Sequence, residues 1–241
     1  MYGNLLVGLS FGWWIDKHNR HHAHPNTEGS DPDIGDGAFA FTHAQARGRA
    51  SAFGRAMARR QSWLFFPMML LEGINLHVAS VRSLFDGTRR QHSRPVEGIL
   101  LAAHSAAYLA ALFLVLSPWQ ALAFLAVQQG LFGVYMGASF APNHKGMPIL
   151  PEDDKTDYLR RQVLTSRNVR GGRVVDFVFG GLNYQIEHHL FPSMPRPNLR
   201  RAQEIVRRYC DGQGISYRED TLLASYAQTL RHLGEVGSSA R

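Results

Sequence analysis

The sequence predicts an all-α fold, a multi-pass membrane helical bundle whose histidine-bearing helices lie on the cytoplasmic side. Two apolar runs, residues 96–116 and 119–140, carry almost no charge, and each has the length of about 20 residues that crosses a bilayer core. Histidines cluster at helical spacing near both ends of the chain. Basic residues flank the apolar runs without interrupting them, which is typical of the cytoplasmic ends of membrane spans.

The first fifteen residues predict a membrane-contacting helix that leads into the first histidine cluster. Trp13 and Trp14 at its end suit the boundary between lipid and water. The cluster that follows has the spacing HxxHH. On a helix that turns by about 100° per residue, the third and fourth residues after the first fall on either side of it. We therefore expect His18, His21 and His22 to share one face.

Residues 25–42 are rich in Gly, Pro, Asp and Asn and predict a loop. Asp31, Asp33 and Asp36 in this loop lack the glutamate that completes an EF-hand calcium site. We expect these carboxylates to be solvated. Residues 44–60 then predict a polar helix that carries several arginines.

A membrane-associated helix is expected at about residues 61–84. Its central part is apolar, but Glu72, Asn75, His77 and Ser80 are polar, and polar groups are costly in lipid unless they face protein or water. The helix is therefore expected to be tilted or interfacial, with its polar stripe facing inward. For Glu72 and His77, a structural hydrogen-bond network is at least as strong an explanation as a functional role.

The two apolar runs predict a membrane hairpin at about residues 96–140. The turn between them, Ser117-Pro118, is uncharged, whereas basic residues precede the hairpin and follow it. The positive-inside rule then places both outer ends in the cytoplasm. Both histidine clusters would lie on that side. The basic residues before the hairpin are Arg82, Arg89, Arg90 and Arg94.

The second histidine cluster lies on a helix predicted at residues 174–190, which Pro192 ends. Gln185, His188 and His189 share one face of that helix. Two such helices packed together would direct five imidazoles to one point, which predicts a metal site; the alternative is two unrelated polar patches. Imidazole binds iron, zinc and copper, so the ligand type does not select the metal. The zinc-peptidase motif HExxH is absent, because Asn19 follows His18.

The remaining features are consistent with a membrane protein of a reducing compartment. The net charge is +7 and Cys210 is the single cysteine, which excludes an internal disulfide. The apolar runs make nucleic acid a remote partner. An amphipathic helix at residues 199–210 has arginines that suit an anionic membrane surface, and residues 234–241 predict a mobile tail. Five further histidines are expected to be structural: His24, His43, His92, His104 and His232.

The motif HxxHH, followed far along the chain by QxxHH and Leu190-Phe191-Pro192, resembles the membrane fatty acid desaturase family, in particular its acyl-lipid and front-end branch. The resemblance implies a desaturase domain over residues 1–233. It also implies two non-haem iron ions that use O₂ and two electrons to place a double bond in the acyl chain of a lipid or an acyl thioester. No catalytic group separate from the metal ligands is implied. The implied ligands are His18, His21, His22, His144, His188 and His189, with Asn143 close to His144.

Three further expectations depend on this resemblance. Gln185 stands where many relatives carry histidine, so we expect it to support the site through a hydrogen bond. Membrane lipids would surround the spans. The motif His-Pro-Gly-Gly of a fused haem module is absent, so the electrons are expected from a separate ferredoxin or flavoprotein reductase.

The chain departs from the family at its amino-terminal end. Relatives carry an HxxxH box and a pair of spans ahead of HxxHH, and neither is found here. We rank three explanations: a start codon assigned too far downstream, a truncated chain without activity, and a partner chain that supplies the missing piece. The alternatives to a desaturase are an inactive or merely metal-binding membrane protein and a lipid hydroxylase on the same scaffold.

Overall fold

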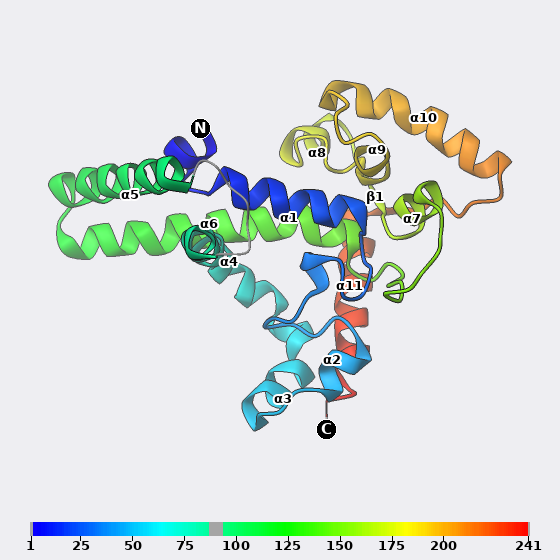
Figure 1. The fold of residues 1–241 in the computed structure, drawn as a ribbon, viewed down its shortest axis with the longest axis horizontal. Coiled ribbons are helices and arrows are strands. Elements are labelled where there is room, and N and C mark those ends of the chain that lie inside the picture. The colour runs from blue at the N-terminus through cyan, green and yellow to red at the C-terminus, as the bar shows by residue number, and fades with distance from the viewer. Residues whose placement is uncertain (1, 87–93, 241) are drawn as a thin grey trace. The chain divides into compact units, whose positions relative to one another are not determined.

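The computed structural model describes residues 2–86 and 94–240, and in these ranges it is built of helices with one short pair of parallel strands (Figure 1). The all-α prediction is confirmed. The chain divides into two compact units. The apolar unit comprises Met1–Asn19 and Phe66–Gly137, and the polar unit comprises Arg20–Phe65 and Ala138–Arg241. The predictions for Arg89, Arg90 and His92 fall outside the described residues.

The apolar unit contains a short π-helix η1 (Gly3–Val7), most of α1 (Phe11–Ala23) and α4 (Gln61–Phe85), α5 (Arg94–Val115), and most of α6 (Pro118–His144). Helices α4, α5 and α6 are long and apolar enough to cross a membrane, and they occupy the segments of the predicted hairpin and membrane-associated helix. A Cβ on Gly133 of α6 would lie 2.3 Å from the Met69 carbonyl oxygen of α4. The two helix backbones therefore touch, as small residues allow in membranes.

Polar side chains of the apolar unit bind backbone groups. His77 of α4 donates from Nδ1 to the carbonyl of Gly8 at 2.9 Å, and His104 of α5 donates to that of Leu5 at 2.8 Å. Buried Glu97 of α5 accepts hydrogen bonds from the Ser10 hydroxyl and from the Gly12 N–H in the first turn of α1. His104 therefore has the structural contact expected of it, and His77 has the structural contact that was one of its two predicted roles.

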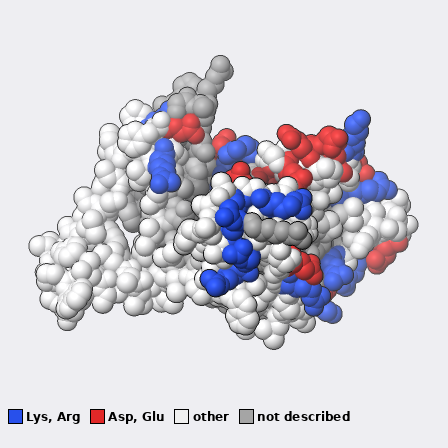
Figure 2. All heavy atoms as spheres, turned by 90° about the horizontal axis from the view of Figure 1, so that it is seen from below, with Lys and Arg blue, Asp and Glu red and all other residues white. Residues whose placement is uncertain are grey.

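The polar unit consists of several short helices and the two longer helices α10 (Arg196–Gly212) and α11 (Leu222–Gly237) around buried polar side chains. Figure 2 shows Lys, Arg, Asp and Glu crowding one part of the visible face. The helix predicted at residues 44–60 is in fact two helices, because Gly48 ends the first and the Ser51 hydroxyl caps the second. The elements are α2 (His43–Arg47), α3 (Ala52–Arg59), α7 (Tyr158–Leu164), β1 (Asn168–Arg170), α8 (Arg173–Val178), α9 (Gln185–Leu190), α10 (Arg196–Gly212), β2 (Glu219–Thr221) and α11 (Leu222–Gly237), with a 3₁₀ turn η2 (Pro32–Ile34).

The continuous helix predicted at residues 174–190 is wrong, because α8 and α9 are separate. Gly180 and Gly181 between them have φ of 56° and 83°, in the left-handed region that ends a right-handed helix. Strands β1 and β2 pair in parallel, with Asn168 opposite Glu219. The turn and the strand pair place α9 as a short element beside α7 and α10 (Figure 1).

Residues 234–240 are helical or packed, in contrast to the mobile tail expected at residues 234–241. Helix α11 continues to Gly237, and Val236 and Ala240 are 1% and 2% exposed in a core cluster with Ala58. A Cβ on Gly237 would lie 2.2 Å from the Ala58 carbonyl oxygen. The glycine therefore permits close packing of α11 on α3. The small residues of this segment, which suggested mobility, allow this contact.

Candidate metal centre

Three histidines from remote parts of the sequence meet inside the polar unit. His21 lies near the end of α1, His144 is the last residue of α6, and His189 lies on α9. All three are buried, and one ring nitrogen of each lies within 4.8 Å of those of the others. Their ring centroids are 4.7 to 5.0 Å apart. We call these residues the histidine trio.

Each ring of the trio has an oxygen atom at Nδ1. His21 faces Asp31 Oδ1 at 2.9 Å, His144 faces the Thr165 carbonyl at 3.1 Å, and His189 faces Gln162 Oε1 at 2.9 Å. The orientation of the Gln162 amide follows from its other end, where Nε2 donates to the His22 carbonyl at 3.0 Å. Because these oxygens only accept, each Nδ1 must carry a hydrogen. Each Nε2 is then left with a lone pair.

The three lone pairs converge. Nε2 of His21 and Nε2 of His144 are 3.3 Å apart. The buried Nε2 of His189 has no hydrogen-bond partner among the residues that the structure describes. Lone pairs this close repel each other unless a cation or a proton lies between them. Neutral imidazole nitrogens are good ligands for iron, zinc and copper, so the donor set fits a transition metal.

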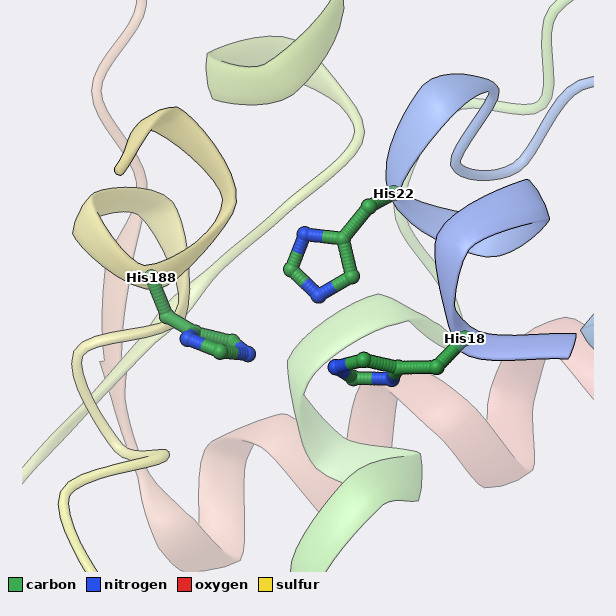
Figure 3. Close-up of side chains that lie close together, drawn as sticks. All are labelled: His18, His22 and His188. Carbon is green, nitrogen blue, oxygen red and sulfur yellow. The ribbon is translucent and has the colours of Figure 1, made fainter. Parts of the chain in front are cut away.

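A second group of imidazoles adjoins the trio. The rings of His22 and His188 are 4.7 Å apart, and the ring of His22 stacks on that of His189 at 4.2 Å. In Figure 3, His22 of α1 faces His188 of α9, and His18 lies one turn before His22 on α1. The polar unit thus brings together His21, His22, His144, His188 and His189. The ligand role of His18 stays a prediction from its shared helix face.

Gln185 and Asn143 lie beside the trio. Gln185 Oε1 accepts from Asn143 Nδ2 at 3.1 Å, so Gln185 Nε2 donates to the lone pair of His144 Nε2 at 2.9 Å. Asn143 also donates to the carbonyls of Ser139 and Leu182. Gln185 therefore reaches the centre as a hydrogen-bonding amide that Asn143 orients, which is the position expected for a supporting residue.

The expectation that Asp31 is a solvated loop residue is wrong. Its side chain is buried, and besides His21 it accepts from the backbone N–H groups of Asn26 and Asp33 at 2.7 and 2.8 Å. Burial raises the pKa of Asp31, but the hydrogen bond and charge of His21 more than offset this and hold it below its usual range. The residue caps η2. The sequence Asp31-Pro32 predicts a turn, but the local sequence does not predict the contact with His21.

The electrostatics of His144 and His189 favour neutral rings. Burial, followed by the neighbouring His144 and His21, holds the pKa of His189 well below 6.5. The ring is therefore uncharged at neutral pH and keeps the lone pair that a metal needs. Two carboxylates face His21 Nδ1. Asp31 Oδ1 lies 2.9 Å from this nitrogen, and Asp33 Oδ2 lies 3.5 Å from it.

Helix α9 is fixed by a buried hydrogen-bond network that the histidine motifs did not predict. Glu187 accepts from the Tyr217 hydroxyl and from Asn168 Nδ2, both at 2.8 Å. Asn168 Oδ1 accepts from the backbone N–H of Ile186 at 2.9 Å. Burial raises the pKa of Glu187. The carboxylate of Glu187 thus holds α9 in place between Gln185 at its start and His188 and His189 near its end.

The sequence matches a known family and several curated proteins. The family model described as fatty acid desaturase matches residues 1–221. The Delta(6)-fatty-acid desaturase fat-3 of Caenorhabditis elegans is 30% identical over 96% of this chain and 55% of its own length. The acyl-lipid (9-3)-desaturase of Physcomitrium patens is 30% identical over 99% of this chain and 46% of its own.

A third relative, the Delta(8)-fatty-acid desaturase of Euglena gracilis, is 33% identical over 97% of this chain and 58% of its own length. The chain thus spans about half the length of the curated relatives it matches. No solved structure matches the chain.

Proposed function

Because the chain belongs to the fatty acid desaturase family, as its histidine motifs predicted, we propose that it introduces a double bond into a fatty acyl chain in an O₂-dependent reaction. The observation that carries the proposal is the convergence of three Nε2 lone pairs in the histidine trio. The substrate is an acyl chain of a lipid or an acyl thioester. The term acyl-lipid in the name of the Physcomitrium patens relative favours the lipid.

Six histidines are proposed to hold two iron ions. His21, His144 and His189 would bind one, consistent with the buried group that they form. His22 and His188, whose rings are 4.7 Å apart, would contribute to the other, together with His18, which shares the helix face of His22. Bound iron would supply the O₂ activation that breaking two unactivated C–H bonds requires. In the balanced reaction, O₂, two electrons and two protons take up the two hydrogens of the acyl chain and leave two waters.

In that reaction, the residues of this chain would bind the metal and orient the histidines that hold it. The oxygens of Asp31, Thr165 and Gln162 fix which nitrogen of each ring carries the hydrogen, and burial keeps His144 and His189 neutral. Such outer partners set the orientation and basicity of ligating histidines. The apolar helices α4, α5 and α6 would keep the protein in the bilayer that holds the substrate.

The partners and the side of the membrane are part of the proposal. The electrons would come from a separate ferredoxin or flavoprotein reductase. The basic residues on both sides of the hairpin favour a cytoplasmic active site, which such a donor can reach.

The test is expression of the chain in cells that supply a ferredoxin and its reductase, with mass spectrometry of the fatty acid methyl esters and metal analysis of the purified protein. We expect a new double bond and bound iron, and neither in His189→Ala. Leu223→Ala, at a side chain 82% exposed on α11, is the matched control and should behave as the unaltered chain. Hydroxylated acyl chains without a new double bond would indicate the hydroxylase, and iron without any product would indicate metal binding alone.

A further inference from the structure

Helix α6 lacks one backbone hydrogen bond just before the residues that it contributes to the metal centre. Pro142 lies inside the helix, two residues ahead of His144. Proline has no N–H, so the carbonyl four residues earlier, that of Ala138, loses its helical donor. The helical pattern resumes afterwards, since Lys145 N–H donates to the Ala141 carbonyl at 3.0 Å. The last turn, which carries Asn143 and His144, therefore follows a missing hydrogen bond.

A side chain of α11 supplies the missing donor. The hydroxyl of Tyr226 donates to the Ala138 carbonyl at 2.8 Å. Burial raises the pKa of Tyr226 to about 12, so the hydroxyl keeps its proton at neutral pH. A buried carbonyl without a donor is destabilising, and this one is paired by a residue 88 positions away in the sequence.

The end of the same helix is closed by Arg167. Its Nε donates to the Pro142 carbonyl at 2.9 Å, Nη2 donates to that of Lys145 at 3.0 Å, and its backbone N–H donates to that of Asn143 at 2.8 Å. The guanidinium is fully buried, and a cation is favoured at the carboxyl end of a helix. Helix α11 contributes again, because the Thr229 hydroxyl also donates to the Lys145 carbonyl at 3.1 Å.

We propose that Tyr226 and Arg167 are positioning residues for His144. Tyr226 replaces the hydrogen bond that Pro142 removes, and Arg167 holds the carbonyls beyond the break. Together they keep the last turn of α6 at the position where His144 Nε2 meets His21 Nε2. Neither residue contacts the trio nitrogens. The inference rests on the proposed metal centre and extends it to α11, an element with no histidine in that centre.

The test uses a double-variant cycle in the purified full chain, with cobalt(II) alone as the probe and its absorption bands as the readout. Tyr226→Phe removes only the hydroxyl, and we expect the cobalt dissociation constant to rise about tenfold, with bands shifted toward those of His144→Ala. Pro142→Ala restores an N–H to residue 142. The double variant should therefore return to within about twofold of the unaltered chain. Tyr209→Phe, at a tyrosine 51% exposed on α10, is the control and should not differ.

Each other outcome is decisive. Unchanged cobalt binding in Tyr226→Phe would overturn the inference while leaving the metal centre intact. A loss that Pro142→Ala does not restore would mean that Tyr226 acts through the packing of α11, which also overturns it. If the unaltered chain bound no cobalt, the proposed metal centre would fail and the inference with it.

Discussion

The two units of the molecule bury polar groups in different ways. In the apolar unit, polar side chains form hydrogen bonds with a hydroxyl or a backbone group of the first twelve residues, as Glu97, His77 and His104 do. In the polar unit, His21, His144 and His189 bond at Nδ1 and turn Nε2 toward one another. The three side chains of the first arrangement are each paired. In the second, Nε2 of His21 faces Nε2 of His144, which also accepts from Gln185 Nε2, and Nε2 of His189 has no partner among the described residues. Hydrogen bonding that remains incomplete at one shared point, and not histidine content, therefore distinguishes a candidate metal centre from structural polarity.

The largest expected effect contrasts one histidine from each unit. His189→Ala should lower metal affinity by more than about 100-fold, since a ligand matters more than the outer partners that cost 10 to 100-fold. His104→Ala should leave bound metal unchanged and lower only the melting temperature. Metal analysis and thermal melting of both variants measure this. Equal metal loss in the two would remove the distinction between the units.

Asp31 tests whether the oxygen at Nδ1 is part of the centre. Asp31→Asn keeps the size of the side chain but removes the charge that faces His21, and we expect metal affinity to fall by about 10 to 100-fold. Asp36→Asn is the matched control, because Asp36 is exposed in the same loop. Isothermal titration with cobalt(II) gives both values, and similar results for the two variants would contradict the role of Asp31.

Acid should destabilise the metal-free chain. His189 has its pKa held well below 6.5 by burial and then by its neighbours, so below pH 6.5 the unfolded state takes up a proton that the folded state does not. Stability is therefore full above this value and falls as pH decreases toward the folded pKa. A change from pH 6.5 to 5.5 should cost about 1 kcal/mol from this residue. Melting temperatures measured across this pH range should depend less on pH in His189→Gln. The same pH dependence in that variant as in the unaltered chain would exclude His189 as the cause.

The smallest effect is expected in the apolar unit. Glu97→Gln can still accept from Ser10 or Gly12 but loses the carboxylate, so the free energy of unfolding should fall by about 0.5 to 1 kcal/mol. Metal affinity should change less than about twofold. Denaturation in detergent gives the first value and cobalt titration the second. Glu204→Gln, on the exposed face of α10, serves as control; a large loss of metal in Glu97→Gln would show that this cap also sustains the metal centre.

Local signals account for what could be predicted from the sequence. The hairpin follows from the length and hydropathy of residues 96–116 and 119–140, and the ligand candidates follow from helical spacing. The partners of Asp31, Gln162 and Glu187 could not be predicted in this way, because each lies on another segment, 10, 27 and 30 residues away. The break between α8 and α9 had a local signal, since Gly180-Gly181 favours a turn. The burial of α11 had none, because small residues suit both a tail and a tight contact.

Gln162 connects the two histidine motifs through a single amide group. Its nitrogen is bound to the His22 carbonyl, so its oxygen is turned to His189. If α1 were displaced, the amide could rotate, and the hydrogen on the His189 ring could move from one nitrogen to the other. Whether the second motif is ready to bind a metal would then be decided by the docking of the first, and folding and loading would occur in a fixed order.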